Sequence, residues 1–212
     1  ITLEGLTLRV VSPLNASGAL PTIIYYHGGC FISGGFTTHD NQLRQLAYYS
    51  GCRVIAVQYR LAPEHIWPAA HDDAEVGARL VWRHAEKLGV DKQRITLAGD
   101  SAAGHLALVT ALRLKASGEW QPHRLLLIYP MLDATASHKS YTTNGEDYII
   151  THHTLLSGYE MYLPDFDPRH PEASPLWRAV FSGLPPAHIV TSELHSLRGE
   201  GEALHKRLTE QC

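Results

Sequence analysis

The sequence predicts an α/β fold with a mostly parallel sheet and helices on both faces. Continuous apolar runs at residues 22–26, 53–59 and 124–129 are typical of strands buried on both sides of a parallel sheet. Segments with helical periodicity alternate with these runs along the chain, as they do in βαβ units. With 212 residues and 44% hydrophobic content, the chain is long enough for one core, so we expect a single domain over residues 1–212.

In the first half of the chain, residues 2–11 alternate partly between apolar and polar side chains and predict a strand or hairpin. The β-branched and aromatic run at 22–26 (TIIYY) predicts a buried strand. A helix is expected over 38–50, with Thr38 or Asp40 as its cap. After the strand at 53–59, an amphipathic pattern predicts one long helix over 69–88 that Gly89 ends.

The second half continues the alternation of strands and helices. Polar or Pro-rich connections are expected between these elements, at 132–150 and 165–184. The predicted strands are 94–98, 124–129 and 188–191, and the predicted helices are 106–114, 151–163 and 197–209.

A serine stands at the corner between the predicted strand 94–98 and the helix 106–114. Small residues around Ser101 would let strand and helix approach closely, and the helix N-terminus would direct free N–H groups at a negative charge. The pattern Gly-x-Ser-x-Gly is met at Gly99 and Ser101 but missed at Ala103. This motif alone leaves two interpretations open, a nucleophilic serine and an ordinary N-cap.

Two consecutive glycines, Gly28 and Gly29, follow the buried strand 22–26. They are consistent with an ordinary tight turn, or with a loop whose bare N–H groups donate to an oxyanion. In parallel sheets the chemistry gathers beyond the carboxyl ends of the strands. We therefore expect residues 27–31, Ser101 and the loop after Thr191 to lie together.

Composition argues against several classes of protein. A net charge of −3 is unlike that of a nucleic-acid-binding protein, and the sequence contains no apolar run of the ~18 residues that a membrane span needs. Three cysteines without metal or redox spacing (Cys30, Cys52 and Cys212) favour a reduced compartment, hence the cytoplasm. None of the 14 histidines has metal-ligand spacing, so we expect neither a metal nor another cofactor.

Three blocks together resemble a known family. Residues 27–31 (HGGCF), 59–64 (YRLAPE) and 99–102 (GDSA) are similar to the HGGGF, YRLAPE and GDSAG motifs of the hormone-sensitive-lipase-like carboxylesterases, which are α/β-hydrolases and include bacterial acetyl esterases. The order and separation of the blocks match, and the similarity runs from about residue 25 to about residue 202. The resemblance implies that Ser101 is the nucleophile and that the N–H groups of Gly28, Gly29 and Ala102 form the oxyanion hole. It gives Asp100 a structural role.

The chain departs from the family pattern at several places. Cys30 replaces the third glycine of HGGG, which we expect to be tolerated if the loop needs no positive φ there. His195 stands where the resemblance places the aspartate of the catalytic triad, and the family's catalytic histidine has no counterpart before residue 212. Three explanations stay open: a chain incomplete at both ends, lacking the N-terminal cap and the last strand and helix; a short member without a working triad; or His195 itself acting as the base.

The resemblance implies a carboxylic ester hydrolase that acts on short-chain esters through a serine acyl-enzyme. The alternative is a catalytically silent protein of the same fold that binds a small molecule or a regulatory partner, which His195 favours. The expected partner is a small ester, with neither nucleic acid nor membrane, and a homo-oligomer is compatible with the sequence.

Overall fold

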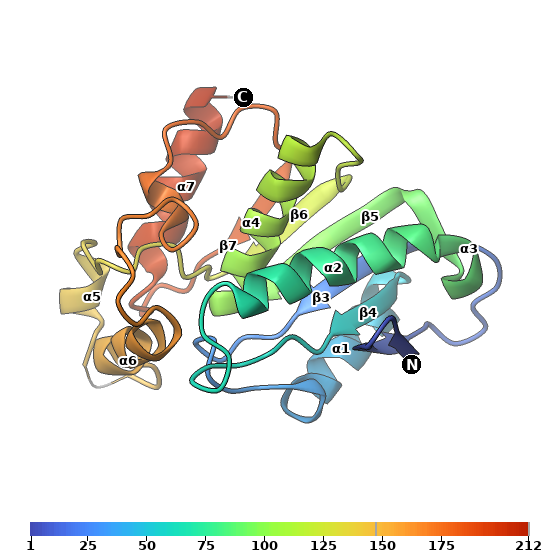
Figure 1. The fold of residues 1–212 in the computed structure, drawn as a ribbon, viewed down its shortest axis with the longest axis horizontal. Helices are drawn as coiled ribbons and strands as arrows, with labels where there is room; N and C mark the ends of the chain where they lie inside the picture. Colours follow the sequence, from blue (N-terminus) through green and yellow to red (C-terminus); the bar gives the residue numbers. More distant parts are fainter. Residues whose placement is uncertain (147, 212) are drawn as a thin grey trace.

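The computed structural model describes residues 1–146 and 148–211, so Cys212 lies outside the described residues. In this part of the chain the strands form one seven-stranded sheet in the order β1-β2-β4-β3-β5-β6-β7 (Figure 1). The strands β2, β4, β3, β5, β6 and β7 pair in parallel except for the antiparallel pair β2–β4, and β1 pairs antiparallel with β2. The strands are β1 (Thr2–Leu3), β2 (Leu6–Val11), β3 (Leu20–Tyr26), β4 (Arg53–Val57), β5 (Val90–Asp100), β6 (Arg124–Ile128) and β7 (Ala187–Val190). The predicted mostly parallel α/β fold is confirmed.

Helices cover both faces of the sheet. Leu43 and Ala47 of α1 pack with Tyr25 and other side chains on one face, whereas α2 and α4 pack against each other and on Ile24 and Tyr26 on the opposite face. Successive side chains of β3 therefore point to opposite faces of the sheet and pack in two separate hydrophobic cores. The helices are α1 (Phe36–Ser50), α2 (Ala69–Arg83), α3 (Ala85–Leu88), α4 (Ala102–Ser117), α5 (Ser140–Thr143), α6 (His152–Tyr162), the 3-10 turn η1 (Pro175–Trp177) and α7 (Arg198–Gln211).

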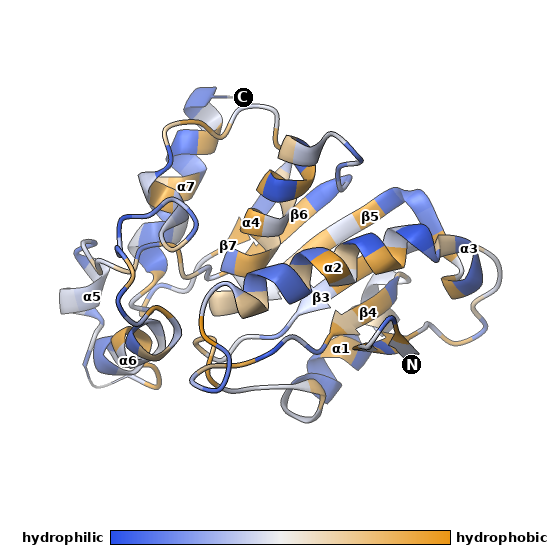
Figure 2. Ribbon diagram, in the orientation of Figure 1, coloured by the Kyte–Doolittle hydropathy of each residue, from blue (hydrophilic) through white to orange (hydrophobic). Residues whose placement is uncertain are grey.

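Hydropathy follows this layering. α2 alternates between orange and blue along its length in Figure 2, as expected of a helix with one face on the sheet. α4 is different, because twelve of its residues are buried, on the sheet side and on the side of its neighbours. The helix that carries Ser101 at its start is thus enclosed by protein and held firmly.

The structure corrects several predicted boundaries. The cap of α1 is Gly35 rather than Thr38 or Asp40, and the Thr38 hydroxyl instead accepts a hydrogen bond from the Gly35 N–H at 3.0 Å. The long helix expected over 69–88 is interrupted at His84, whose φ of −95° and ψ of 22° leave the helical region. β5 is longer than predicted because its first residue, Val90, already pairs with Leu20 of β3.

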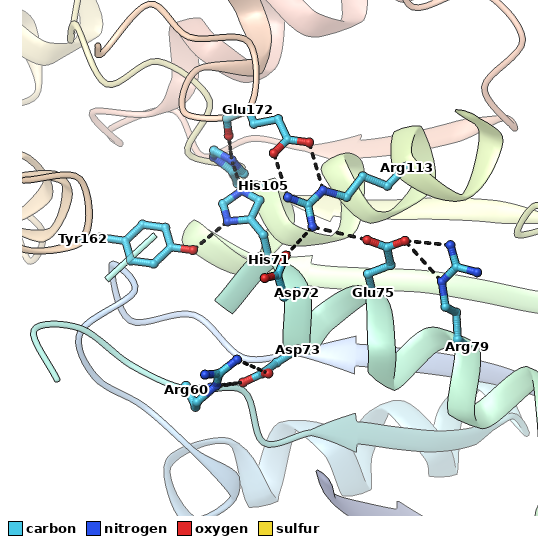
Figure 3. Close-up of polar contacts among 10 residues, drawn as sticks. All are labelled: Arg60, His71, Asp72, Asp73, Glu75, Arg79, His105, Arg113, Tyr162 and Glu172. Atoms are coloured by element: carbon cyan, nitrogen blue, oxygen red, sulfur yellow. Dashed lines mark hydrogen bonds and ion pairs between the residues drawn. The ribbon is translucent and has the colours of Figure 1, made fainter. Parts of the chain in front are cut away.

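A polar network holds the segment that follows α6 onto α2 and α4 (Figure 3). Arg113 of α4 donates two hydrogen bonds to Glu172, at 2.9 and 2.7 Å, and a third to Asp72 of α2 at 2.9 Å. Beside these pairs, His71 Nε2 lies 3.0 Å from His105 Nε2 in the buried interior. The irregular connection predicted over 165–184 is therefore fixed against α2 and α4.

The sequence contains no apolar run long enough for a membrane span, and the helices of the structure can be compared with that observation. Among the described residues, no helix combines the length and the apolar character needed to cross a bilayer.

Candidate active site

The carboxyl ends of β3 and β5 bring the serine turn and the glycine loop together. Tyr26 at the end of β3 is in register with Gly99 near the end of β5. A cavity of about 650 Å³ opens beyond this edge, and Gly28, Gly29, Ser101 and His195 all contribute to its wall. The prediction that these three segments meet is confirmed.

Ser101 occupies a sharp turn between β5 and α4. Its φ of 55° and ψ of −122° lie in a region that side-chain-bearing residues rarely adopt, which costs on the order of 1–3 kcal/mol. Two backbone hydrogen bonds fix the turn, from the Ser101 N–H to Ile128 at 2.9 Å and from the Met131 N–H to the Ser101 carbonyl at 3.1 Å. Because the partners are the last residue of β6 and a residue of the segment that follows this strand, the strained geometry is enforced from the side of β6.

The side chain of Ser101 does not cap α4. A capping serine accepts a hydrogen bond through Oγ from an N–H of the first helical turn, but no such bond forms here, and the N–H of Gly104 binds the Ser101 carbonyl at 3.0 Å. Ser101 is only partly buried and lines the cavity. Ser101 thus occupies the N-cap position of α4 without capping the helix through its side chain, which favours the nucleophile over the ordinary N-cap.

Glycine is required around the turn by close contact. A Cβ on Gly99 would meet the Ala103 carbonyl oxygen at 2.3 Å, and one on Gly104 would meet Pro130 at 2.9 Å. Ala103 is accommodated as a fully buried residue of α4, with Gly99 taking the close approach. The missing second glycine of the motif thus leaves the turn intact.

The glycine loop differs from the prediction at Gly28. Its N–H donates to Asp100 Oδ1 at 3.0 Å, so this group is engaged and is not free for an oxyanion. In the described part of the chain, the N–H groups of Gly29, Cys30 and Ala102 donate to no acceptor. The sequence therefore assigned one donor to the wrong residue: Gly28 ties the loop to β5, and the free donors follow it.

Cys30 has a positive φ, whereas we expected it to be tolerated if the loop needed no positive φ there. Its φ is 54°, and Phe31 follows with a φ of 65°. The side chain is buried against α6, since a Cβ on Gly158 would lie 2.5 Å from the Cys30 Cβ. Cys30, which replaces the family's third glycine, therefore adopts a strained left-handed conformation. Gly158 on the facing helix leaves room for its side chain.

Burial should make the Cys30 thiol unreactive. It raises the pKa of Cys30 to about 11, so at pH 8 only about one thiol in a thousand is ionised. We expect alkylation by iodoacetamide at pH 8, followed by peptide mass mapping, to leave Cys30 unmodified in the folded protein and to modify it after unfolding in urea. The half-buried Cys52 is the internal comparison. Alkylation of Cys30 as fast as Cys52 in the folded protein would contradict this account.

Asp100 holds the loop from the strand side. Its Oδ1 accepts hydrogen bonds from the Tyr25 hydroxyl at 2.7 Å and from the Gly28 N–H, and its Oδ2 lies 3.4 Å from His39 Nε2. Burial raises the pKa of Asp100, but the hydrogen bonds with His39 and Tyr25 outweigh burial and hold the pKa below its usual value. These contacts are consistent with the structural role that the resemblance implies for Asp100: its carboxylate ties the glycine loop to β5. No sequence spacing could reveal it, because its partners come from β3 and α1.

His195 lies on the cavity wall with its ring already engaged. It stacks on Tyr129 at a centroid distance of 5.3 Å, and its Nδ1 accepts a hydrogen bond from the Leu197 N–H at 3.0 Å. Burial lowers the pKa of His195. An imidazole whose Nδ1 accepts must carry its proton on Nε2 when neutral, so Nε2 has no lone pair for a serine proton. The geometry therefore disfavours His195 as the base.

The described residues provide no set of ligands for a metal ion. Within residues 1–146 and 148–211, no three or more His, Cys, Asp or Glu side chains come together in a way that could hold an ion. Away from Ser101 the cavity wall is mainly apolar. Its apolar side chains are those of Cys30, Tyr148, Ile149, Ile150 and Leu194. Such a lining suits an uncharged organic group.

Comparisons with known proteins agree with this geometry. A family model described as an alpha/beta hydrolase fold matches residues 23–212. The chain is 37% identical over 213 residues to the carboxylesterase NlhH of Mycobacterium tuberculosis, covering 97% of this chain and 67% of that protein. It is likewise 37% identical to the ethyl acetate hydrolase of Pseudomonas putida, covering 98% of this chain and 67% of the relative.

A solved structure gives the same result. The hyperthermophilic esterase from the archaeon Pyrobaculum calidifontis superposes with a TM-score of 0.90 at 40% identity, over 96% of this chain and 68% of that one. The chain thus spans about two thirds of the length of these relatives. The strained serine at the strand-to-helix corner, the glycine loop on the same cavity wall and these matches lead to one conclusion: the chain belongs to the α/β-hydrolase fold family and, within it, to the hormone-sensitive-lipase-like carboxylesterases.

Proposed function

We propose that this chain carries the nucleophile and the oxyanion hole of a carboxylic ester hydrolase that acts on small, uncharged short-chain esters. The observation that carries the proposal is the Ser101 turn, whose side chain does not cap α4 and lines a mainly apolar cavity. The relatives named as carboxylesterase and ethyl acetate hydrolase support it.

The chemistry follows from the positions of the groups. Ser101 Oγ forms a bond to the acyl carbon, and the alcohol leaves with the proton that the serine gives up. The N–H groups of Gly29, Cys30 and Ala102 are the free donors beside this position, and each such donor is typically worth ~2.7–4 kcal/mol toward an oxyanion. Water then releases the acid from the acyl-enzyme.

Neither imidazole on the cavity wall is assigned as the base. The ring nitrogens of His39 lie against Asp100 and the Thr38 hydroxyl, and His195 is engaged with Leu197. In the described residues Ser101 Oγ forms no hydrogen bond with either ring. The serine and its donors are therefore the part of the catalyst that we place on this chain.

Covalent labelling tests the proposal. We expect a fluorophosphonate probe to label the wild-type protein, and p-nitrophenyl acetate to give an acylation burst, while Ser101→Ala gives neither. Ser182→Ala, at an exposed serine outside the cavity, controls for nonspecific reaction and should label like the wild type. Equal labelling of the wild type and Ser101→Ala would remove the esterase assignment.

The silent-binding alternative rests on His195 at the family's acid position. It predicts that the same cavity takes up a small ester without cleaving it, so that the wild type shows binding but no Ser101-dependent burst. The cytoplasmic location, the single domain and a homo-oligomer stay predictions from the sequence.

A further inference from the structure

A buried carboxylate lies directly beside the place where the proposed reaction develops negative charge. Asp100 precedes Ser101 in the chain, is 8% exposed, and lines the same cavity. Its Oδ1 accepts hydrogen bonds from Tyr25 and Gly28, both of which are neutral donors. Without a cation beside it, the Asp100 carboxylate would still accept the Gly28 N–H but would repel an oxyanion. The repulsion would be strong because Coulomb interactions are strong where water is excluded.

The second carboxylate oxygen faces an imidazole. His39 of α1 places Nε2 3.4 Å from Asp100 Oδ2, with 14% of its side chain exposed, toward the cavity. Its Nδ1 lies 2.9 Å from Thr38 Oγ1, and that hydroxyl is 2.9 Å from the Gly35 carbonyl. The hydroxyl can donate to Gly35 while accepting from the ring, so both ring N–H groups of an imidazolium have acceptors.

Charges around His39 favour its protonated form. The groups that face it from the packed elements are Asp100 of β5, Tyr25 of β3 and His27 after β3, whose ring centroid is 5.6 Å away. Burial lowers the pKa of His27 and raises that of Tyr25, so both stay neutral near pH 7. The hydrogen bond with Asp100 raises the pKa of His39. Among the described residues no other cationic group lies within ion-pair distance of Asp100.

We infer that His39 is a positioning residue: its protonated ring neutralises Asp100 and keeps that carboxylate in place to hold the Gly28 N–H and, through it, the oxyanion loop. Its effect on rate rests on the proposed function, whereas the ion pair itself does not. No sequence motif pointed to this role, because it depends on α1 lying against the end of β5.

The pH dependence has a definite sign. Since the pKa of His39 is raised on folding, its contribution to stability is fully present below the unfolded value of 6.5 and is lost as pH rises through the folded value. The rate should fall over the same alkaline range, as the Asp100 charge becomes uncompensated.

His39→Gln tests the inference, because glutamine offers an N–H donor but cannot titrate. We expect kcat to fall about tenfold with KM little changed, in line with a loop displaced by a fraction of an ångström, and the alkaline decline to disappear. The wild-type melting temperature should fall by more than that of His39→Gln between pH 6 and pH 9. The matched control is His65→Gln, at an exposed histidine outside the cavity, which should keep both profiles of the wild type.

Two outcomes overturn the inference: an alkaline decline retained in His39→Gln, or identical pH dependence of the melting temperature in wild type and variant. If the variant does not fold, histidine NMR titration of the wild type and Asp100→Asn decides, since one elevated imidazole pKa must fall when the carboxylate is lost. Absence of any such signal overturns it. If the wild type shows no Ser101-dependent labelling, the proposed function fails, while the stability and NMR measurements still decide the ion pair.

Discussion

Replacing Glu200 by glutamine is expected to stabilise the protein strongly at alkaline pH. Glu200 of α7 is fully buried, and burial raises its pKa from 4.5 to about 8, although hydrogen bonds from Tyr141 and from the backbone N–H groups of Leu132 and Asp133 partly offset that effect. In the described residues no cation pairs with this carboxylate. Its ionised form is therefore costly in the folded protein.

The sign follows from the raised pKa. The contribution of Glu200 to stability is fully present below pH 4.5 and is lost as pH rises through about 8. At about 1.4 kcal/mol for each pKa unit, the difference between 4.5 and about 8 amounts to roughly 4–5 kcal/mol at pH 9. Glutamine keeps a carbonyl oxygen that accepts from the two backbone N–H groups, and its amide N–H can donate to the Tyr141 oxygen. It never ionises.

Urea unfolding at pH 6 and pH 9 measures this effect. We expect the free energy of unfolding of Glu200→Gln to exceed that of the wild type at pH 9 and the advantage to shrink toward pH 6. Glu202→Gln is the matched control, because Glu202 is an exposed residue of the same helix that pairs with Arg198, an ion pair of the kind worth about 0–1 kcal/mol. Parallel pH profiles for the wild type and Glu200→Gln would contradict the account.

Gly28→Ala is expected to cost most of the activity. The added Cβ would lie 2.2 Å from Asp100 Oδ2 and 2.9 Å from the Asp100 carbonyl oxygen, so a rotation of the carboxylate alone cannot relieve the contact. The loop must move away from β5, which breaks the hydrogen bond from the Gly28 N–H to Asp100 and displaces the Gly29 and Cys30 N–H groups. We expect kcat to fall by about 10²–10³, as for loss of one oxyanion donor.

The same substitution should destabilise the fold by about 1–3 kcal/mol through overpacking. Gly118→Ala separates the two effects: it lies at the C-terminal end of α4, has open space around its Cα and a φ of 70°, and should cost about 1 kcal/mol by backbone strain alone. Ester hydrolysis and thermal melting of the three proteins check both. A Gly28→Ala protein that melts near the wild type and keeps its kcat would show that the loop does not depend on this contact.

Local patterns allowed much of the fold to be predicted. A run such as TIIYY specifies a buried strand, because a parallel strand covered on both faces has no polar side to show. Element boundaries were less predictable. The early start of β5 at Val90 depends on its pairing with Leu20, a residue far away in the sequence.

The candidate site divides in the same way. Short motifs were enough to predict the family, the strand-to-helix corner at Ser101 and the glycine loop. The rule that parallel strands end at one edge of the sheet then predicted that the corner and the loop meet. Three features of the site became visible only in the folded chain: the Ser101 side chain does not cap α4, Gly28 is held by Asp100 while Gly29 and Cys30 keep free N–H groups, and His39 faces the carboxylate. The sequence could not predict these features, because hydrogen bonds between β3, α1 and β5 join residues up to 75 positions apart, and no local pattern encodes which donor reaches which acceptor.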